Sequence, residues 1–202
     1  PDPAHLARVA AFAKEAEDCE AKGDFKEALD ALKSLEKLEP KDSRIAALRP
    51  RLEEKLKRWE TWRDVHQKAE IEKKEAQRLN TTDAWHKVLA LIADAEKLAP
   101  MERFQTQSRA LLAPSRQYHL WAQARDEEKK NNFVGAIDLV GQAIAVVEAP
   151  AELTAYKTSL EKRKRKQELD RGASVAAKEA VQAKAYELWQ KARELADDPK
   201  DT

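Results

Sequence analysis

One stretch decides the fold of this chain: Gly23-Asp24-Phe25-Lys26-Glu27-Ala28-Leu29, followed by Leu32, Leu35, Leu38 and Pro40. Its pattern returns twice more, and a weaker fourth copy follows. The copies are Asp83-Ala84-Trp85-His86-Lys87-Val88-Leu89 with Ile92, Ala95, Leu98 and Pro100; Asn131-Asn132-Phe133-Val134-Gly135-Ala136-Ile137 with Val140, Ala143 and Pro150; and Ala185-Tyr186 with Trp189, Ala192, Leu195 and Pro199. The central residues of the copies fall at positions 28, 88, 136 and 185, which are 60, 48 and 49 residues apart. Such self-similarity is typical of repeat proteins.

The order of residue types within a copy predicts a helical hairpin. The copies open with Gly23-Asp24, Thr82-Asp83 and Asn131-Asn132, residues that end one helix and cap the next. The aromatic residue that follows can lie across the preceding helix, and the small residue three positions later lets two backbones approach. Proline closes each copy because it cannot continue a helix. The predicted structural repeat positions are Gly23, Phe25, Ala28, Trp85, Val88, Phe133, Ala136, Ala185 and Trp189.

The composition favours an all-α chain with a large surface. Charged residues make up 37% of the 202 residues, against a typical ~25%, and only four residues are glycine. Ala, Leu, Glu, Lys and Arg dominate, and these residues lose least on entering a helix. We predict a single helical-repeat domain over residues 1–202, an α-solenoid of antiparallel hairpins. Its repeats are expected at about 4–41, 42–100, 101–150 and 151–199.

The first helices of the later repeats are predicted to be unusually long. From Asp42 to Leu79, apolar residues recur at three- and four-residue steps, as in coiled coils, which predicts one helix of about 37 residues and 55 Å. Pro50 interrupts this pattern, and Pro114 interrupts the stretch 102–130. At both prolines a kink or a restart of the helix is favoured over a loop, because the period continues beyond them. The other helices are predicted at about 4–22, 24–39, 83–99, 132–147, 151–171 and 174–197.

These residues resemble the tetratricopeptide repeat (TPR) family, with Gly23 and Phe25 at the turn, Ala28 at the crossing and Pro40 at the exit. In the first helix the family expects a bulky residue, a small residue and an aromatic. This chain has Phe12, Ala16 and Cys19 there, so two of the three fit. The repeats depart from the family in length, since family repeats have ~34 residues. The resemblance implies an extended surface that binds a protein or peptide.

No arrangement typical of catalysis, of a metal site or of a cofactor site is found. The four histidines, His5, His66, His86 and His119, lie far apart in the sequence, and none lies four residues from another or from Cys19. Phosphate loops, nucleophile elbows and supported Ser/His/Asp arrangements are also absent. We therefore expect a protein that is not an enzyme, with no catalytic residue, metal or cofactor.

Two features are candidate partner contacts. The first is the pair Trp59 and Trp62, interpreted as core packing or, alternatively, as an exposed groove for a partner. The second is the run Lys162-Arg163-Lys164-Arg165-Lys166. We interpret it first as an exposed helix extension with local ion pairs, since five consecutive helical residues point around the whole circumference. The alternatives are a nuclear-import signal, a phosphate-binding strip and a dock for an acidic partner.

Charge and hydropathy limit the partner classes. The 38 basic and 37 acidic residues leave a net charge of +1, so long-range attraction of nucleic acid is not expected. The longest apolar runs are far shorter than the ~18 residues that span a bilayer, so no membrane insertion is expected. We expect a soluble segment and favour the cytoplasm. Because the chain begins Pro1-Asp2-Pro3 without a methionine, we interpret it as a segment of a larger protein.

The expected function is a non-catalytic scaffold or adaptor for protein–protein interaction. The alternative is a structural or regulatory helical appendage of a larger enzyme or membrane-anchored protein, which acts through self-association of its long heptad-like helices. No motif in the sequence identifies the partner.

Overall fold

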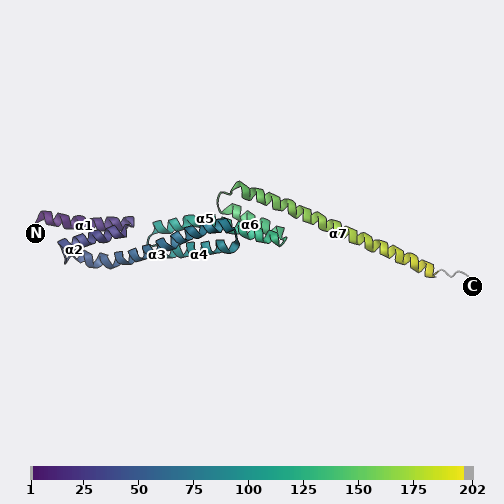
Figure 1. The fold of residues 1–202 in the computed structure, drawn as a ribbon, viewed down its shortest axis with the longest axis horizontal. Coiled ribbons are helices and arrows are strands. Elements are labelled where there is room, and N and C mark those ends of the chain that lie inside the picture. The colour runs from purple at the N-terminus through teal and green to yellow at the C-terminus, as the bar shows by residue number, and fades with distance from the viewer. Residues whose placement is uncertain (1, 198–202) are drawn as a thin grey trace, which may run out of the picture. The chain divides into compact units, whose positions relative to one another are not determined.

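The chain is all-helical in the computed structural model, which describes residues 2–197 and the side chains as far as residue 193. The described residues form seven helices and no strand (Figure 1). The helices are α1 (Pro3–Lys22), α2 (Phe25–Leu38), α3 (Ser43–Leu79), α4 (Thr82–Leu98), α5 (Glu102–Lys129), α6 (Phe133–Val146) and α7 (Ala151–Asp197). The prediction of an all-α chain is confirmed. Within residues 2–197, none of these helices combines the length and apolar character needed to cross a bilayer.

Turn residues end and begin the helices close to where the sequence expects them, but two predicted caps differ. Asp24 makes no side-chain cap bond, and Thr81 rather than Thr82-Asp83 caps α4, accepting a hydrogen bond from the Ala84 N–H at 3.4 Å.

At the end of α1, Gly23 adopts a φ of 75°, a left-handed conformation that L side chains rarely adopt, and its N–H donates to the Glu20 carbonyl at 2.9 Å. Asn80 ends α3 with a φ of 53°. At the start of α6, the Asn132 side chain accepts a hydrogen bond from the Gly135 N–H at 3.2 Å.

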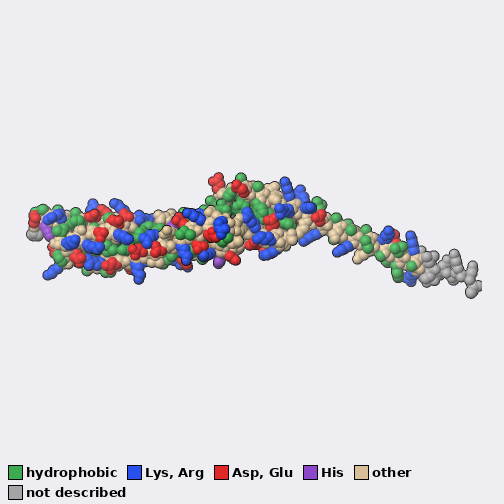
Figure 2. Space-filling view, viewed as in Figure 1, with side chains coloured by type: hydrophobic (Ala, Val, Ile, Leu, Met, Phe, Trp, Pro, Cys, Tyr) green, Lys and Arg blue, Asp and Glu red, His purple; other side chains and the backbone are tan. Residues whose placement is uncertain are grey.

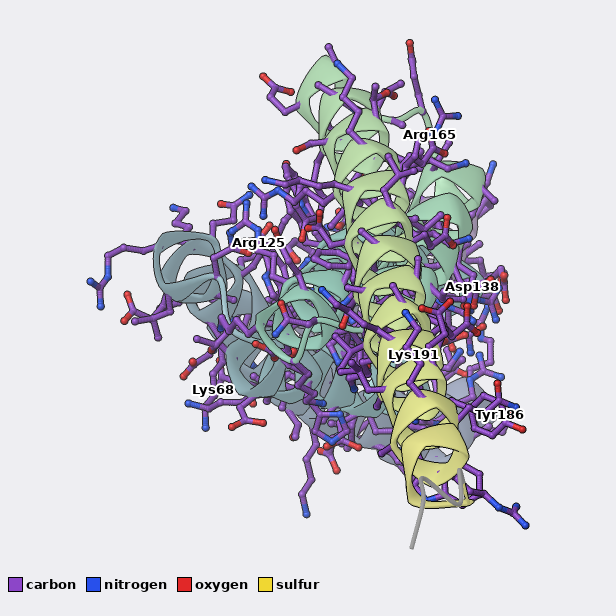
Figure 3. All side chains as sticks on the ribbon, turned by 90° about the vertical axis from the view of Figure 1, so that its right-hand side faces the viewer. Lys68, Arg125, Asp138, Arg165, Tyr186 and Lys191 are labelled. Atoms are coloured by element: carbon purple, nitrogen blue, oxygen red, sulfur yellow. The ribbon has the colours of Figure 1, made fainter. Side chains whose placement is uncertain are left out.

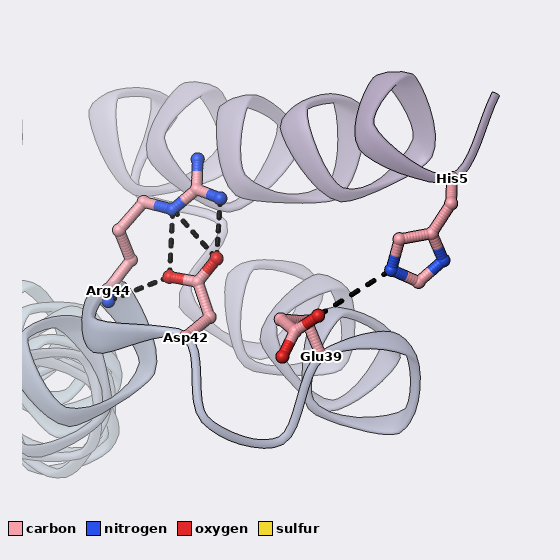
Figure 4. Close-up of polar contacts among 4 residues, drawn as sticks. All are labelled: His5, Glu39, Asp42 and Arg44. Atoms are coloured by element: carbon pink, nitrogen blue, oxygen red, sulfur yellow. Dashed lines mark hydrogen bonds and ion pairs between the residues drawn. The ribbon is translucent and has the colours of Figure 1, made fainter. Parts of the chain in front are cut away.

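The start of α3 has a charged cap. Asp42 accepts a hydrogen bond from the Arg44 backbone N–H at 2.9 Å, and its carboxylate also pairs with the Arg44 guanidinium at 2.5 Å (Figure 4). The hydrogen bonds from Arg44 lower the pKa of Asp42 although partial burial opposes them. In the same region His5 Nε2 of α1 lies 3.6 Å from Glu39 Oε2, just after α2.

The first compact unit, Pro1–Ala122, contains two antiparallel hairpins and most of α5. Helix α1 packs on α2, α2 on α3, and α3 on α4. Aromatic side chains attach α5 to these hairpins. The ring centroid of Phe104 lies 6.4 Å from that of Phe25 and 4.6 Å from that of Trp62. Further along α5, Tyr118 stacks on Trp85 of α4 at 5.1 Å.

The second compact unit, Gln123–Thr202, contains the end of α5, α6 and α7. Helix α6 packs against α7, whose Leu153 and Leu160 are fully buried. The boundary between the two units falls within α5, which runs through it as a continuous helix. The single repeat domain and the solenoid of hairpins that the sequence suggests therefore stay predictions.

The predicted repeat positions are buried in three of the four copies. Equivalent side chains of α2, α4 and α6 are at most 1% exposed: Ala28, Leu32 and Leu35; Val88, Ile92 and Ala95; Ala136, Val140 and Ala143. The spacing of four and then three residues keeps each set on one helix face. The preceding aromatic residue is buried at Phe25 and Trp85 and half-buried at Phe133. These second helices thus bury the face that the sequence predicts.

The predicted fourth hairpin is wrong. Helix α7 is continuous from Ala151 to Asp197, where the sequence suggests two helices at 151–171 and 174–197. Ala185, predicted to lie at a helix crossing, is exposed, and Trp189 is 56% exposed. No capping pair precedes Ala185, and the one glycine, Gly172, costs a helix only about 1 kcal/mol relative to alanine. The side chain of Leu195 and all of Pro199 lie outside the described residues.

The two helix prolines lie inside continuous helices. Pro50 belongs to α3 and Pro114 to α5, and neither helix stops or restarts there. The restart that the sequence left open is therefore excluded at both positions. The predicted 37-residue helix is present as α3, and the predicted limits of α1, α2, α4 and α6 agree with the structure to within one residue at each end.

A buried glutamate connects α1 to α3. Glu20 is 7% exposed, and its carboxylate accepts hydrogen bonds from Arg51 at 2.6 Å and from Lys55 at 2.7 Å. Burial alone raises the pKa of Glu20. The hydrogen bonds from Lys55 and Arg51 and their positive charges outweigh burial, so the pKa lies below its usual value. The ionised carboxylate is thus the form that the fold stabilises.

Candidate binding surface on α7

The basic run 162–166 lies in α7, directly after the buried Leu160 and the exposed Glu161. Four of its five side chains are exposed, and Lys164 is half-buried. Arg163 pairs with Glu128 of α5, and Lys164 lies 3.8 Å from Glu168. One local ion pair, Lys164 with Glu168, is therefore present, as the first interpretation expects, whereas the pair of Arg163 joins α7 to another helix.

Glu128 holds α7 against the end of α5. Its carboxylate accepts a hydrogen bond from the Tyr156 hydroxyl at 2.7 Å and another from Arg163. Burial and the bond to Glu128 raise the pKa of Tyr156. One helical turn beyond Arg163, Gln167 Nε2 donates to the Asn131 carbonyl at 3.4 Å. These contacts fix residues 151–167, which we call the inner half of α7.

A shallow groove of about 460 Å³ lies between α7 and the turn that joins α5 to α6. Its lining consists of Asn131, Phe133, Arg163, Lys166, Gln167, Asp170, Arg171 and Ser174. Three cationic side chains and one carboxylate give the groove a positive character. Among the described residues, Lys166 and Arg171 have no carboxylate at ion-pair distance. The groove therefore suits a segment that carries carboxylate or phosphate groups.

A second depression on α7 is lined by Lys162 and Arg165 of the basic run and again by Lys166. Its volume is about 400 Å³, and Thr158, Glu161 and Leu169 complete its lining. All of these residues belong to one helix, so the depression is part of an open surface. Figure 3 shows Arg165 on α7. The basic residues are thus divided between faces of α7, as their consecutive positions predict.

Residues 168–193, which we call the outer half of α7, are all exposed. The exposed apolar side chains here include Val181 at 70%, Leu188 at 60% and Trp189 at 56%. Figure 2 shows hydrophobic side chains beside Lys and Arg along this helix, and Figure 3 labels Tyr186 and Lys191 on it. Contiguous exposed apolar side chains are uncommon in soluble proteins outside interaction sites. The outer half of α7 is therefore the candidate binding surface.

The two tryptophans of α3 have different environments. Trp62 is 5% exposed, its Nε1–H donates to Ser108 Oγ at 3.1 Å, and its ring stacks on His66 at 4.9 Å. It is a core residue, and the alternative of a partner contact does not fit it. Trp59 is half-buried and lies beneath the cations of Lys26 at 5.9 Å and Arg63 at 5.2 Å. These contacts leave only part of its ring for a partner.

Sequence reasoning missed the residues that join α7 to its neighbours and those that line the outer half. Glu128 lies 35 residues from Arg163, and no local pattern connects them. A signal for Val181 and Leu188 was present, because they are seven residues apart and in phase with Leu153 and Leu160. The repeat alignment assigned this segment to a second helix and obscured that phase.

Two histidines lie close together outside α7. Within the described residues, no three His, Cys, Asp or Glu side chains gather in a way that would hold a metal ion. The rings of His86 and His119 lie 6.2 Å apart. Burial and the charge of His86 lower the pKa of His119, which favours its neutral form. Neither histidine is among the residues that line the basic groove of α7.

Comparisons with family models, with curated proteins and with solved structures find no match to this chain.

Proposed function

We propose that this chain is a non-catalytic scaffold for protein–protein interaction, built as a solenoid of TPR-like hairpins. The observation that carries the proposal is the outer half of α7, where every described side chain is exposed and large apolar residues lie beside lysines. The free energy falls when another polypeptide covers a surface of this kind, because apolar side chains are removed from water.

The buried hairpins support the proposal because a scaffold needs a rigid base. Three second helices bury equivalent faces, and Glu128 fixes the inner half of α7 to the end of α5. The outer half is therefore presented from an ordered element. Surfaces built in this way on stacked hairpins hold peptides and partner helices in repeat proteins.

Selection from a library of random displayed peptides, with the full chain immobilised, tests the proposal. We expect enriched peptides that compete with one another and that no longer bind after residues 168–202 are deleted. The thermal unfolding midpoint of the shortened chain serves as the folding control. A library that yields no binder, or binders that the deletion does not affect, would contradict the proposal.

A second candidate is a helical appendage that acts through self-association. The observation that favours it is the four- and three-residue spacing of exposed apolar residues in the outer half of α7, because two copies can bury such a stripe against each other. Sedimentation velocity over a wide concentration range distinguishes the candidates. A mass that stays that of one chain throughout excludes self-association.

A further inference from the structure

A seven-residue spacing runs along the whole of α7. Leu153, Leu160, Gln167, Ser174, Val181 and Leu188 are each seven residues from the next. The first two are fully buried, Gln167 and Ser174 line the basic groove, and Val181 and Leu188 are exposed. Seven residues are nearly two helical turns, so neighbouring positions share one side of the helix, and the line of positions turns by about 20° with each step. The line that starts on the packed side of the inner half thus winds gradually to the exposed apolar residues of the outer half.

Alanines complete this stripe. Ala185 and Ala192 alternate with Val181 and Leu188 at steps of four and three residues, which is the spacing of a coiled-coil seam. Helix α3 shows how such a stripe is covered. Its Ala69 and Ala76, also seven residues apart, are at most 1% exposed where α4 packs on it. Small side chains let a second helix approach closely, so the stripe on α7 fits a helix.

The outer half of α7 is incomplete without such a helix. All of its described side chains are exposed, so burial against other helices contributes little to its stability. Isolated helices are only marginally stable in water, since most helical stability in proteins comes from the packing of one face. A partner that packs on the stripe would supply the missing contacts.

Lysines at the edges of the stripe define the partner's charge. Lys184 and Lys191 each follow an apolar seam residue by three positions and lie beside the seam, whereas Lys178, seven residues before Ala185, lies in line with the seam at its inner end. All three are exposed, and among the described residues no carboxylate lies within ion-pair distance of them. The residues of a partner helix that flank its apolar stripe would face these lysines. Aspartate and glutamate at those flanking positions therefore match the surface.

A second copy of this chain could cover the apolar stripe but does not match the charges beside it. An antiparallel copy would set Lys184 and Lys191 against the same lysines of its own, and like charges repel. A parallel copy would set Lys184 against Trp189. Neither arrangement supplies a carboxylate.

We propose that the outer half of α7 is the docking face for an amphipathic helix of another protein, whose apolar stripe is flanked by Asp and Glu. The stripe Val181, Ala185, Leu188 and Ala192 buries the partner's apolar residues. Lys184 and Lys191 beside the seam, with Lys178 at its inner end, pair with the partner's carboxylates. The proposal rests on the proposed scaffold function and assigns its surface and the chemistry of its partner.

The test uses a synthetic amphipathic peptide with leucines at the seam positions and glutamates at the flanking positions. Its affinity for the full chain is measured by fluorescence anisotropy. We expect Leu188→Asp to weaken binding by about tenfold or more, as for a charge placed in the centre of an interface. Gln190→Asp is the matched control, because it adds the same charge on the opposite face of α7, and it should change the affinity less than about twofold.

A second peptide, with lysines in place of the glutamates, tests the charge. It should bind at least about tenfold more weakly, and the affinity of the glutamate peptide should fall as salt rises. Hydrogen exchange locates the binding site of the peptide. The amides of residues 175–193 should become protected from exchange only when the glutamate peptide is bound.

Three results would overturn this inference, and the first two of them would leave the scaffold function intact. The first is equal binding of the two peptides. The second is equal loss of binding in Leu188→Asp and Gln190→Asp. The third is a dimer of the free chain that Leu188→Asp dissociates, which would assign the stripe to a second copy. Failure of the displayed-peptide selection, by contrast, would count against the scaffold function itself.

Discussion

Helices α3 and α7 begin alike and end differently. In each, the first part of the helix is bound by a glutamate of an earlier helix. Glu20 of α1 accepts hydrogen bonds from Arg51 and Lys55 of α3. Glu128 of α5 accepts hydrogen bonds from Tyr156 and Arg163 of α7. Beyond that, α3 is covered by α4, whereas the outer half of α7 is exposed throughout. The difference teaches that the same helical pattern is a core element or a binding surface according to whether the chain supplies the next helix.

The largest effect is expected when the same charge is placed at equivalent repeat positions of α2 and α7. Ala28→Asp buries an unpaired carboxylate at a position that is 0% exposed, and we expect it to lower the free energy of unfolding by about 3–5 kcal/mol. Ala185→Asp places the carboxylate in solvent and should change it by less than about 0.5 kcal/mol. Urea unfolding followed by circular dichroism measures both. Similar losses would show that Ala185 is buried in solution.

A second test removes a leucine from each long helix. Leu52 of α3 is 0% exposed, so Leu52→Ala should cost about 2–5 kcal/mol through lost burial and the cavity left behind. Leu188→Ala removes a side chain that is 60% exposed and should cost less than about 0.5 kcal/mol. Thermal unfolding gives both values. A large loss for Leu188→Ala would mean that the outer half of α7 packs on something in the free protein.

A third test measures how much the buried Glu20 contributes to the free energy of unfolding. Glu20→Gln removes the charge that Arg51 and Lys55 bind, and we expect a loss of about 1–3 kcal/mol near neutral pH. Because the folded pKa of Glu20 is lowered, its contribution is present above the unfolded pKa of about 4.3 and is lost as pH falls through the lowered folded value. Unfolding measured against pH should show the variant approaching the wild-type stability in acid. A constant difference at every pH would remove the electrostatic explanation.

The smallest effects come from two glycines. Gly23 has a left-handed backbone, so Gly23→Ala should cost about 1–2 kcal/mol. An added Cβ there also meets the flexible end of Arg103 at 2.6 Å. Gly172 lies within α7 with nothing within 4 Å of an added Cβ, and Gly172→Ala should favour the helix by about 0.5–1 kcal/mol. Far-UV circular dichroism should show more helix in Gly172→Ala, and no increase would mean that this segment is not limited by helix propensity.

Local patterns explain which parts of the fold were predictable. Asp42 and Gly23 mark helix ends through hydrogen bonds within a few residues of themselves, and the limits of α2, α4 and α6 follow from caps and apolar spacing. The prediction of a fourth hairpin was wrong because the apolar spacing at Trp189 and Ala192 resembles that of the second helix of a hairpin. No turn precedes these residues. The contacts that shape the candidate site, such as Glu128 with Arg163, join residues that are distant in the sequence.

The sequence by itself determined the helices, because helix formation and capping depend on residues three or four positions apart. It also determined the buried face of three second helices. The continuity of α7 is also local, because no turn pair precedes Ala185. Only the tertiary structure decided that the inner half of α7 is covered and that its outer half is exposed. Burial depends on which other helix lies alongside, and that is settled by contacts between distant residues rather than by the residues of α7 alone.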